Sequence, residues 1–477
     1  MRASLSVLSP AEREQVHERT LHVLATTGMR VDTTLGRAIL REAGAEVDDE
    51  RRRVRFPAEL VERSLALPPK QFELGGRRAG WSHSMGAGAM TLVADGGGTL
   101  VADAETGERR AATGDDWRLA TRLCDAVDDI GVYWWMVEPP YDLSSAGGLV
   151  AYARELFGEF GKHVQDSFAA PETAVWWLRA LEVVFGSREE VRLLRPFSFL
   201  ITPASPLIIE EQYTDTWLSL RGWGIPVAAM PMPLMGATAP ATRLATLVQA
   251  NCETLGTLCL VQAAEPGVPF IYAPVVAIMD PRSGSYAAGD IENAVLSVGA
   301  IEMARFYGLP VEASGCGTDA STPSPQAAYE KAASALLAGL PAPDLLVGPG
   351  MLAGATILSL EQLVLDVEMA RMTLTASDGI LVDDDRWLDE AMERVGPGGN
   401  FLGERVTRRS LRDGEWSVRQ GLRATRGGSS ANASAHPMAA AREEVRRLLA
   451  ERQPDPLPDD VDRGLRELEG EARRARA

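Results

Sequence analysis

Cysteine and histidine are scarce in this chain of 477 residues, and their scarcity excludes several kinds of site. No two of the four cysteines form a C-x-x-C pair, and four is a low number for this length, so we expect a reduced, cytoplasmic protein. The five histidines are scattered, without an H-E-x-x-H motif or an i,i+4 pair. The sequence therefore predicts no metal site. The cysteines are Cys124, Cys252, Cys259 and Cys316, and the histidines are His17, His22, His83, His163 and His436.

Basic patches and long apolar runs are lacking too. The net charge is −18, and the one basic run that stands out, Arg51–Arg53, lies between two hairpin-like segments and is predicted to be a solvated turn. Nucleic acid is therefore excluded as a partner. The first residues contain no apolar core typical of a signal peptide, and each long apolar run is broken by proline, glycine or charge before it reaches the length of a membrane span. We expect a soluble protein without membrane contact.

Several motifs of nucleotide binding and covalent catalysis are also missing. The sequence has no G-x-S-x-G elbow, no P-loop and no Rossmann glycine fingerprint. It has no Asp-x-His-x-x-Gly loop, the arrangement whose histidine would ligate the cobalt of a corrinoid. The triple glycine after Asp95 lacks a following helix, so it is predicted to be a plain turn rather than a phosphate-binding loop. We expect the chain to bind no cofactor of its own.

The first part of the chain, residues 1–114, is predicted to be an α+β extension followed by hairpins. Ser9-Pro10 is a helix start signal, a second helix is expected near 34–42, and a short strand and a helix begin around Pro57. Residues 90–110 alternate β-branched runs with glycine turns, a pattern typical of hairpins.

From about residue 115 the pattern becomes strand, loop, helix, repeated. A doubly wound sheet and a (β/α)8 TIM-type barrel both fit such repeats, and the absence of a dinucleotide fingerprint favours the barrel, over 115–400. An eighth strand is expected, as the best candidate, over 377–383. Residues 401–477 form a C-terminal segment with amphipathic helices over 438–452 and 459–475. The seven clear strands are expected over 131–139, 162–168, 197–202, 226–231, 269–274, 310–315 and 344–348.

The carboxyl ends of these strands carry the long Gly/Pro loops, whereas the connections that precede the strands are short. In a barrel, the site lies at the carboxyl ends. Aromatic side chains there, together with acids, suit a desolvated organic cation, although core packing is the other reading for each aromatic. Glu253 lies in an otherwise apolar stretch, where a carboxylate needs a partner in a site or a structural network.

Ordered segments of the chain resemble the trimethylamine–corrinoid methyltransferase superfamily, which includes glycine betaine methyltransferases. They are GAEVDDERRRVRFPAELVERSL, KHVQDSF, TPASPL, PMPLMGATAPAT, QANCETLGTLCLVQAAEPGVPFIY, MDPRSGSYAAGDIENAV, TDASTPSPQAAYEKA, LSLEQLVLDVEM and GPGGNFL. The resemblance implies a (β/α)8 barrel that moves a methyl group from an amine to cobalt(I) of a separate corrinoid protein. After GPGGNFL the family's histidine-containing segment is missing here, which bears on closure of the site and on partner docking.

The founding members of that superfamily carry pyrrolysine, and this sequence has only standard residues. A quaternary ammonium already has a neutral leaving group, so this resemblance implies a betaine-type donor whose methyl group needs only orientation and exclusion of water. The alternatives are transfer to another acceptor such as tetrahydrofolate, or a barrel that binds a quaternary ammonium without chemistry. A homo-oligomer is possible.

With this resemblance, roles are predicted for twelve residues. Glu253 and Asp319 would supply negative charge or orient the substrate. The substrate would be bound by Tyr133, Trp135, His163, Thr202, Asn251 and Tyr272. The loop that would face the corrinoid, whose lack of bulk leaves room for the ring, contributes Gly315, Gly317, Thr318 and Gln326.

Overall fold

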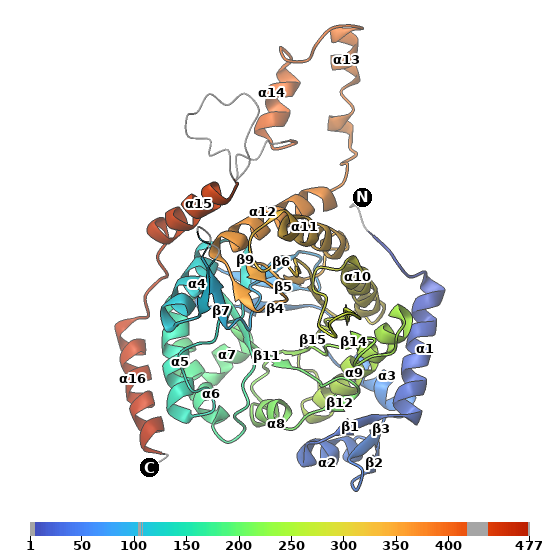
Figure 1. Cartoon of the computed structure of the whole chain (residues 1–477), viewed down its shortest axis with the longest axis vertical. Coiled ribbons are helices and arrows are strands. Elements are labelled where there is room, and N and C mark those ends of the chain that lie inside the picture. Colours follow the sequence, from blue (N-terminus) through green and yellow to red (C-terminus); the bar gives the residue numbers. More distant parts are fainter. Residues whose placement is uncertain (1–4, 104–105, 107, 417–436, 476–477) are drawn as a thin grey trace.

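Eight parallel strands form a barrel at the centre of the molecule, and helices surround it (Figure 1). The structure, a computed structural model, describes residues 5–103, 106, 108–416 and 437–475. Seven neighbouring pairs form one sheet, and a parallel bridge between Tyr272 and Val311 closes it. The fold is thus the expected (β/α)8 barrel. Its strands are β6 (Thr91–Val93), β9 (Ile130–Tyr133), β10 (His163–Asp166), β11 (Phe197–Ile201), β13 (Val227–Ala229), β15 (Phe270–Tyr272), β17 (Glu312–Ser314) and β18 (Leu345–Val347).

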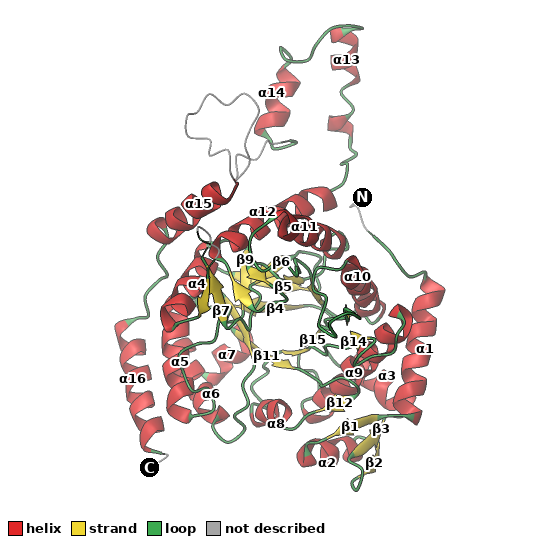
Figure 2. Ribbon diagram, in the orientation of Figure 1, coloured by secondary structure: helices red, strands yellow, loops and turns green. Residues whose placement is uncertain are grey.

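One or two helices follow each barrel strand and cover the outside of the barrel (Figure 2). Because both faces of each strand are covered, most of the strands are short, apolar runs rather than alternating ones; β10 and β17 are the exceptions that carry buried polar residues. The helices are α4 (Gly114–Ala126), α5 (Ala146–Glu159), α6 (Ala174–Phe185), α7 (Arg188–Leu194), α8 (Gln212–Ser219), α9 (Arg243–Ala264), α10 (Ile291–Phe306), α11 (Pro325–Gly339) and α12 (Leu360–Ser377).

The position of one barrel strand differs from the prediction. β6 pairs in parallel with β18 and β9, so the first barrel strand lies within the segment expected to be hairpins and before residue 115. Residues 377–383, expected to supply the eighth strand, instead contain the end of α12 and irregular chain. The hairpin part of the prediction is confirmed a few residues later, where β7 (Leu100–Ala102) and β8 (Arg109–Ala111) pair antiparallel.

The N-terminal unit packs against the outside of the barrel. Ser9 forms a capping box with Glu12 at the start of its first helix, as the Ser-Pro signal indicated. Its strand β1 (Met29–Val31) pairs with the two-residue strand β12 (Ile208–Ile209), which ties the unit to the loop after β11. The unit consists of α1 (Pro10–Thr26), β1 (Met29–Val31), α2 (Thr34–Glu42), β2 (Glu46–Asp48), β3 (Arg53–Arg55) and α3 (Ala58–Ala66).

Helix α9 is the one helix in the described part of the chain with the length and composition of a membrane span. It packs against α1, α2, α3 and α10, and 83% of its most apolar window is buried inside the protein. Burial between the N-terminal unit and the barrel therefore accounts for its apolar composition.

A hairpin closes the amino-terminal end of the barrel. It consists of β4 (Phe72–Gly75) and β5 (Ser82–Met85). Leu74 and Met85 lie in one apolar cluster with the barrel residues Val132 and Leu345. The opposite, carboxyl end is bordered by short pairs: β14 (Leu234–Met235) with β16 (Ala277–Ile278), and β19 (Met351–Leu352) with β20 (Ile357–Leu358).

The C-terminal part first leaves the barrel and then returns to it (Figure 1). After α12 the chain contains α13 (Asp389–Val395) and α14 (Arg405–Arg412), which project beyond the ring of helices. Two amphipathic helices then follow, as predicted: α15 (Pro437–Glu451) packs on α12 and α4, and α16 (Asp459–Arg474) packs on α5 and α6.

Candidate active site

The pairing registers place the barrel's inward-facing side chains in layers. In a barrel of this kind each layer holds four side chains from alternate strands, displaced by about one residue per strand because the strands are tilted. Counting upward toward the carboxyl ends gives three layers, which we call floor, middle and mouth. The floor layer is Glu312, Val93, Gln165 and Ala228; the middle layer is Val347, Trp134, Leu200 and Ala273; the mouth layer is Asp95, Ser314, Ser167 and Met230.

The apolar members of these layers form one packed cluster inside the barrel, distinct from the cluster between strands and helices. Trp134 packs against this inner cluster, whereas its sequence neighbours Tyr133 and Trp135 pack with the outer one. Since successive residues of a strand face opposite ways, Trp134 is the aromatic side chain of this stretch that points into the barrel.

Trp134 is fixed by a hydrogen bond across adjacent strands. Its indole Nε1 donates to Oε1 of Gln165 at 2.5 Å. The amide nitrogen of Gln165 is buried and finds no acceptor among the described residues. The amide is therefore held at one end by the indole and presents its donor to the floor of the barrel.

Glu312 lies across the barrel from Gln165, on the floor layer. The residue is only 2% exposed, and neither carboxylate oxygen accepts a hydrogen bond from a described residue by normal geometry. Burial raises the pKa of Glu312 to about 8, and the nearby amide of Gln165 only partly opposes the rise. Glu312 is thus a mostly protonated acid at neutral pH unless a positive charge comes close to it.

The second carboxyl group inside the barrel is that of Asp95, in the mouth layer. It follows β6 directly and accepts a hydrogen bond from the backbone N–H of Gly96 at 2.9 Å. Burial raises the pKa of Asp95 to about 6, while that N–H group and Lys331 act against the rise. The negative charges of Asp95 and Asp319 add to the effect of burial in raising the pKa of Tyr286. Asp95 at the mouth thus lies one layer above the ring of Trp134, and it is near enough to Tyr286 for its charge to act on that phenol.

A buried ion pair supports the loops that follow β17 and β18. Lys331 and Asp366 lie 2.9 Å apart and are both fully buried. Lys331 also donates to the carbonyl oxygen of Cys316 at 2.6 Å, and Asp366 accepts from the backbone N–H of Gly350 at 2.7 Å. Cys316 has a φ of 52°, a conformation that persists when its surroundings hold it. The pair therefore fixes two of the loops around the mouth.

The loop after β17 is packed against protein rather than open. A Cβ on Gly315 would lie 2.8 Å from Leu346, and one on Gly317 would lie 2.5 Å from the carbonyl oxygen of Ala288. These glycines allow close packing, which differs from the expectation that their small size leaves room for a corrin ring. Bulk at either position would first disturb the loop itself.

The side chains of the remaining residues predicted in this loop bond to Glu330 and to the segment before α10. The hydroxyl of Thr318 and the amide of Gln326 both donate to the carboxylate of Glu330, at 2.5 Å and 2.9 Å. Asp319 accepts hydrogen bonds from the backbone N–H groups of Ala288 and Gly289. Asp319 thereby joins the loop after β17 to the chain that precedes α10.

Four residues predicted to bind substrate lie on the outer side of the barrel. The hydroxyl of Tyr133 bonds to Thr121, and the indole of Trp135 donates to Asp166. Tyr272 donates to Asn251 at 3.0 Å. The structure does not bring these side chains into the barrel interior, because alternation turns Tyr133, Trp135 and Tyr272 toward the helices and Asn251 lies on helix α9. Asn251 is further held by Thr20 and Tyr307.

The other predicted residues are dispersed. Glu253 accepts from Ser205, Gln249 and the backbone N–H of Leu207, so it stabilises the loop after β11. His163 points inward at the amino end, where it bonds to Ser198 at 2.8 Å, and burial lowers the pKa of His163 to about 3. Thr202 follows β11, and by alternation it faces inward above the mouth layer.

The sequence reasoning missed Asp95, Trp134, Gln165 and Glu312. Two signals were available, because Gln165 and Glu312 are polar residues within short apolar strands and a buried polar group needs a reason to be there. Asp95 had no such signal, since its strand was taken for a hairpin.

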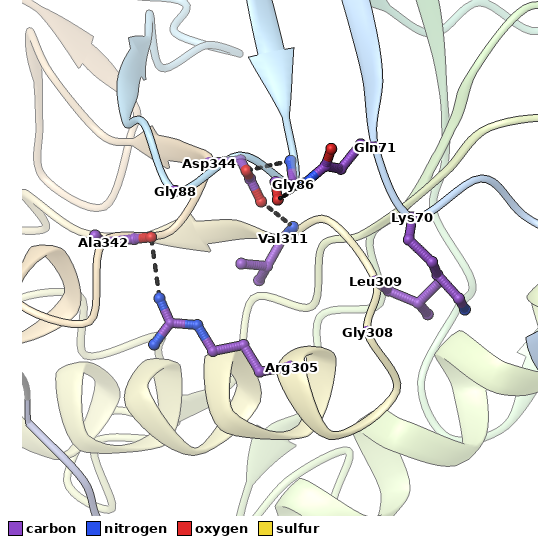
Figure 3. Close-up of a pocket in the computed structure, with 10 residues that line it drawn as sticks. All are labelled: Lys70, Gln71, Gly86, Gly88, Arg305, Gly308, Leu309, Val311, Ala342 and Asp344. Atoms are coloured by element: carbon purple, nitrogen blue, oxygen red, sulfur yellow. Dashed lines mark hydrogen bonds between the residues drawn. The ribbon is translucent and has the colours of Figure 1, made fainter.

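A separate pocket of about 530 Å³ opens at the amino end of β17 and β18, away from the mouth layer (Figure 3). Arg305 donates to the carbonyl oxygen of Ala342, and Asp344 accepts from the backbone N–H groups of Gly86 and Val311. These polar groups hold backbone segments together and lie at the end of a barrel that normally serves stability.

The fold is a (β/α)8 barrel whose carboxyl end carries Asp95 one layer above the inward-facing ring of Trp134. Comparison with known proteins then gives the family: the family model described as Trimethylamine methyltransferase (MTTB) matches residues 2–476, and the chain belongs to this family. Relatives include the trimethylamine methyltransferase MttB of Desulfitobacterium hafniense, 30% identical over 97% of this chain and 93% of that protein. The glycine betaine methyltransferase of the same species is 26% identical over 85% of this chain and 84% of that one.

A solved structure supports the fold alone. The monomethylamine methyltransferase MtmB of Methanosarcina barkeri superposes with a TM-score of 0.50 at 11% sequence identity, over 98% of this chain and 92% of that chain.

Proposed function

We propose that this methyltransferase takes a methyl group from a quaternary amine of the betaine type and delivers it to cobalt(I) of a separate corrinoid protein. Membership of the trimethylamine methyltransferase family supports the reaction class, and a glycine betaine methyltransferase among the relatives supports a quaternary donor. The observation that carries the proposal is the mouth of the barrel, where Asp95 lies one layer above the inward-facing indole of Trp134.

These residues suit a cation that cannot donate hydrogen bonds. A quaternary ammonium is attracted to the face of an aromatic ring and to a carboxylate nearby, and both attractions grow when water is excluded. The twelve side chains of the three layers include two carboxyl groups and no lysine or arginine. The hydrogen bond to Gln165 fixes the plane of the indole, so the ring is set before substrate arrives.

The donor's charge removes the need for acid catalysis. When the methyl group leaves a quaternary nitrogen, the C–N bonding pair stays on nitrogen and a neutral tertiary amine results. No proton has to move, so the tasks of the protein are orientation of one N–CH₃ bond and exclusion of water. Asp95 and Trp134 perform these tasks at the mouth, and Lys331 and Asp366 keep the surrounding loops in place.

A corrinoid, when present on its own protein, supplies the cobalt(I) nucleophile that accepts the methyl group. The positions of the histidines, which could ligate cobalt, fit a corrinoid that arrives on another protein. The described histidines are His17 and His22 on α1, His83 on the hairpin that closes the amino end, and His163 near that same end. Among the described residues, none of these imidazoles lies at the mouth to serve as a cobalt ligand.

Anaerobic mixing of the purified protein with a reduced corrinoid protein and a panel of amines tests this function. The panel contains glycine betaine, a second betaine and trimethylamine. We expect the cobalt(I) absorption to be replaced by that of methylcobalt with a quaternary amine only. Binding of the amine without a spectral change would support a non-catalytic barrel, and methylation of tetrahydrofolate without corrinoid would support the other acceptor; either result contradicts the proposal.

A further inference from the structure

Polar side chains gather on two adjacent strands of the barrel interior. Strands β10 and β11 pair in parallel and turn hydroxyl, imidazole and amide groups inward, whereas the inward residues of β13, β15 and β18 are apolar. A barrel interior that only has to be filled needs no polar stripe, because a buried polar group without a partner costs free energy. The inward polar residues of β10 and β11 are His163, Gln165, Ser167, Ser198 and Thr202.

The lower members of this stripe have partners, and the upper members do not. Ser198 bonds to His163, and the amide oxygen of Gln165 accepts from an indole on the next strand. Among the described residues, the hydroxyl groups of Ser167 and Thr202 have no hydrogen-bond partner. Both residues are half-buried, and neither hydroxyl is shut off from solvent. Two free hydroxyls are therefore accessible from the carboxyl end of the barrel.

The exposure of inward-facing side chains shows where the barrel interior opens. Asp95, Trp134, Ser167 and Thr202 all face inward and are nevertheless partly exposed. Across the barrel, Met230 of the mouth layer is only 1% exposed. The open space therefore borders β6, β9, β10 and β11, which follow one another in this order around the sheet.

The chemical groups around this space are arranged in sequence. Asp95 supplies a carboxyl group, Trp134 an aromatic ring, and the next two strands supply the two hydroxyls. A cation is attracted to the first two groups, and an anion is best held by the hydroxyls, which lie on the far side of the indole from Asp95. By the register of β10 and β11, Ser167 lies beside Leu200, two residues before Thr202. The two hydroxyls thus come from consecutive layers and suit the two oxygens of one carboxylate.

We propose that Ser167 and Thr202 form a carboxylate subsite, and that the substrate is a quaternary amine with a short carboxylate tail. This inference rests on the proposed function, in which the ammonium group is bound at Asp95 and Trp134. With its two ends bound by different groups, the substrate enters in one direction, and repulsion between its tail and Asp95 opposes the reverse one. The tail also prevents rotation of the nearly tetrahedral ammonium group, so one N–CH₃ bond is oriented for transfer.

Isothermal titration calorimetry with two cations tests the subsite. Glycine betaine has the carboxylate tail, whereas tetramethylammonium has a similar charged head without it. Loss of a hydrogen bond to a charged group weakens binding about tenfold or more, so Ser167→Ala and Thr202→Val should each raise the dissociation constant of glycine betaine by about that factor. The dissociation constant of tetramethylammonium should stay near that of wild type in both variants.

The matched control is Ser314→Ala. Ser314 is another partly exposed, inward-facing hydroxyl of the mouth layer without a partner in the described part of the chain. Its inward neighbours on the adjacent strands include the apolar Ala273 and Val347, so it has no second hydroxyl with which to hold a carboxylate. The control should keep the wild-type preference for glycine betaine over tetramethylammonium. Circular dichroism verifies that all variants are folded.

A measurement on wild type alone needs no variant to fold. Choline has the same charged head and a neutral tail, and we expect it to bind at least about tenfold more weakly than glycine betaine. Equal binding of the two would overturn the subsite, and so would Ser167→Ala and Thr202→Val variants that weaken both test cations equally or neither. In those cases the cation site of the proposed function stands. A wild type that binds none of the three cations would instead contradict the proposed function, and the subsite with it.

Discussion

The indole of Trp134 and the amide of Gln165, on adjacent barrel strands, are joined by a hydrogen bond of 2.5 Å inside the barrel. This bond sets the orientation of an aromatic ring one layer below Asp95 and leaves the other end of the amide facing Glu312. The inward-facing side chains of Asp95, Trp134, Gln165 and Glu312, which are distant in sequence, therefore span the barrel interior from the floor layer to the mouth layer.

Removal of the Trp134 ring should weaken binding of the quaternary amine. A desolvated cation–π contact contributes about 2 kcal/mol, so Trp134→Leu should raise the dissociation constant roughly 10- to 30-fold. Trp134→Phe keeps an aromatic face and should lose less. Isothermal titration with glycine betaine measures both. The control is Trp135→Phe, whose indole donates outward to Asp166, and it should leave the dissociation constant near that of wild type. Equal losses in the control would show that the ring of Trp134 has no direct role.

Asp95 should make amine binding depend on pH. Because the pKa of Asp95 is raised to about 6, the carboxylate is charged above that pH and neutral below it. The dissociation constant of the amine should therefore rise as the pH falls from 7 to 5, by about tenfold, equivalent to ~1.4 kcal/mol. Asp95→Asn should bind weakly at all these pH values and show a flat profile. Asp319→Asn should retain the wild-type profile. A wild-type profile in Asp95→Asn would refute the assignment.

Glu312 should lower stability as the pH rises. Its pKa in the folded protein is about 8, above the ordinary 4.5, so the folded state holds the proton more tightly. Below pH 4.5, Glu312 is protonated in both states and does not lower the free energy of unfolding. That free energy then falls as the pH rises from 4.5 through about 8. Glu312→Gln should remove this fall, with a gain over wild type that grows to at most roughly 5 kcal/mol in alkaline solution. Urea denaturation at pH 6 and pH 9 measures the difference. A constant difference between the two pH values would contradict the raised pKa.

Loss of one partner of the Lys331–Asp366 pair should be costly. Lys331→Met leaves a fully buried carboxylate without its cation, which typically destabilises a protein by about 3–5 kcal/mol. The double variant Lys331→Met/Asp366→Leu removes both charges and should recover a large part of that loss. Thermal denaturation of the three proteins compares them. If the double variant is as unstable as the sum of both single variants, the charges do not depend on each other.

The sequence predicted seven of the eight barrel strands and the end of the barrel that carries the loops. Most of those strands are short apolar runs between helices, a pattern that can be recognised without knowledge of tertiary contacts. β6 escaped prediction because it has three residues and is followed by glycines, so local signals favoured a turn. Its role as a barrel strand depends on pairing with β18, about 250 residues later in the chain.

The site was harder to predict than the fold. Tyr133 and Trp135 were predicted to bind substrate, whereas Trp134 is the residue of this stretch that faces the barrel interior; a single step of register inverts which residues face inward. Glu253 was correctly expected to need a partner, but its partner is the loop at Ser205–Leu207, a contact the sequence pattern cannot specify. Asp95, in the mouth layer, and Glu312, two layers below it, share the barrel interior only through strand pairings between segments distant in sequence.

The most direct measurement is a single turnover in which both products are counted. Stoichiometric protein, glycine betaine and cobalt(I) corrinoid protein are mixed without oxygen, and the tertiary amine and the methylated corrinoid are quantified together. The account predicts one tertiary amine for each methyl group gained by cobalt, and a much slower reaction with Trp134→Leu than with Trp135→Phe. Bound glycine betaine that stays fully methylated while cobalt(I) persists would contradict it.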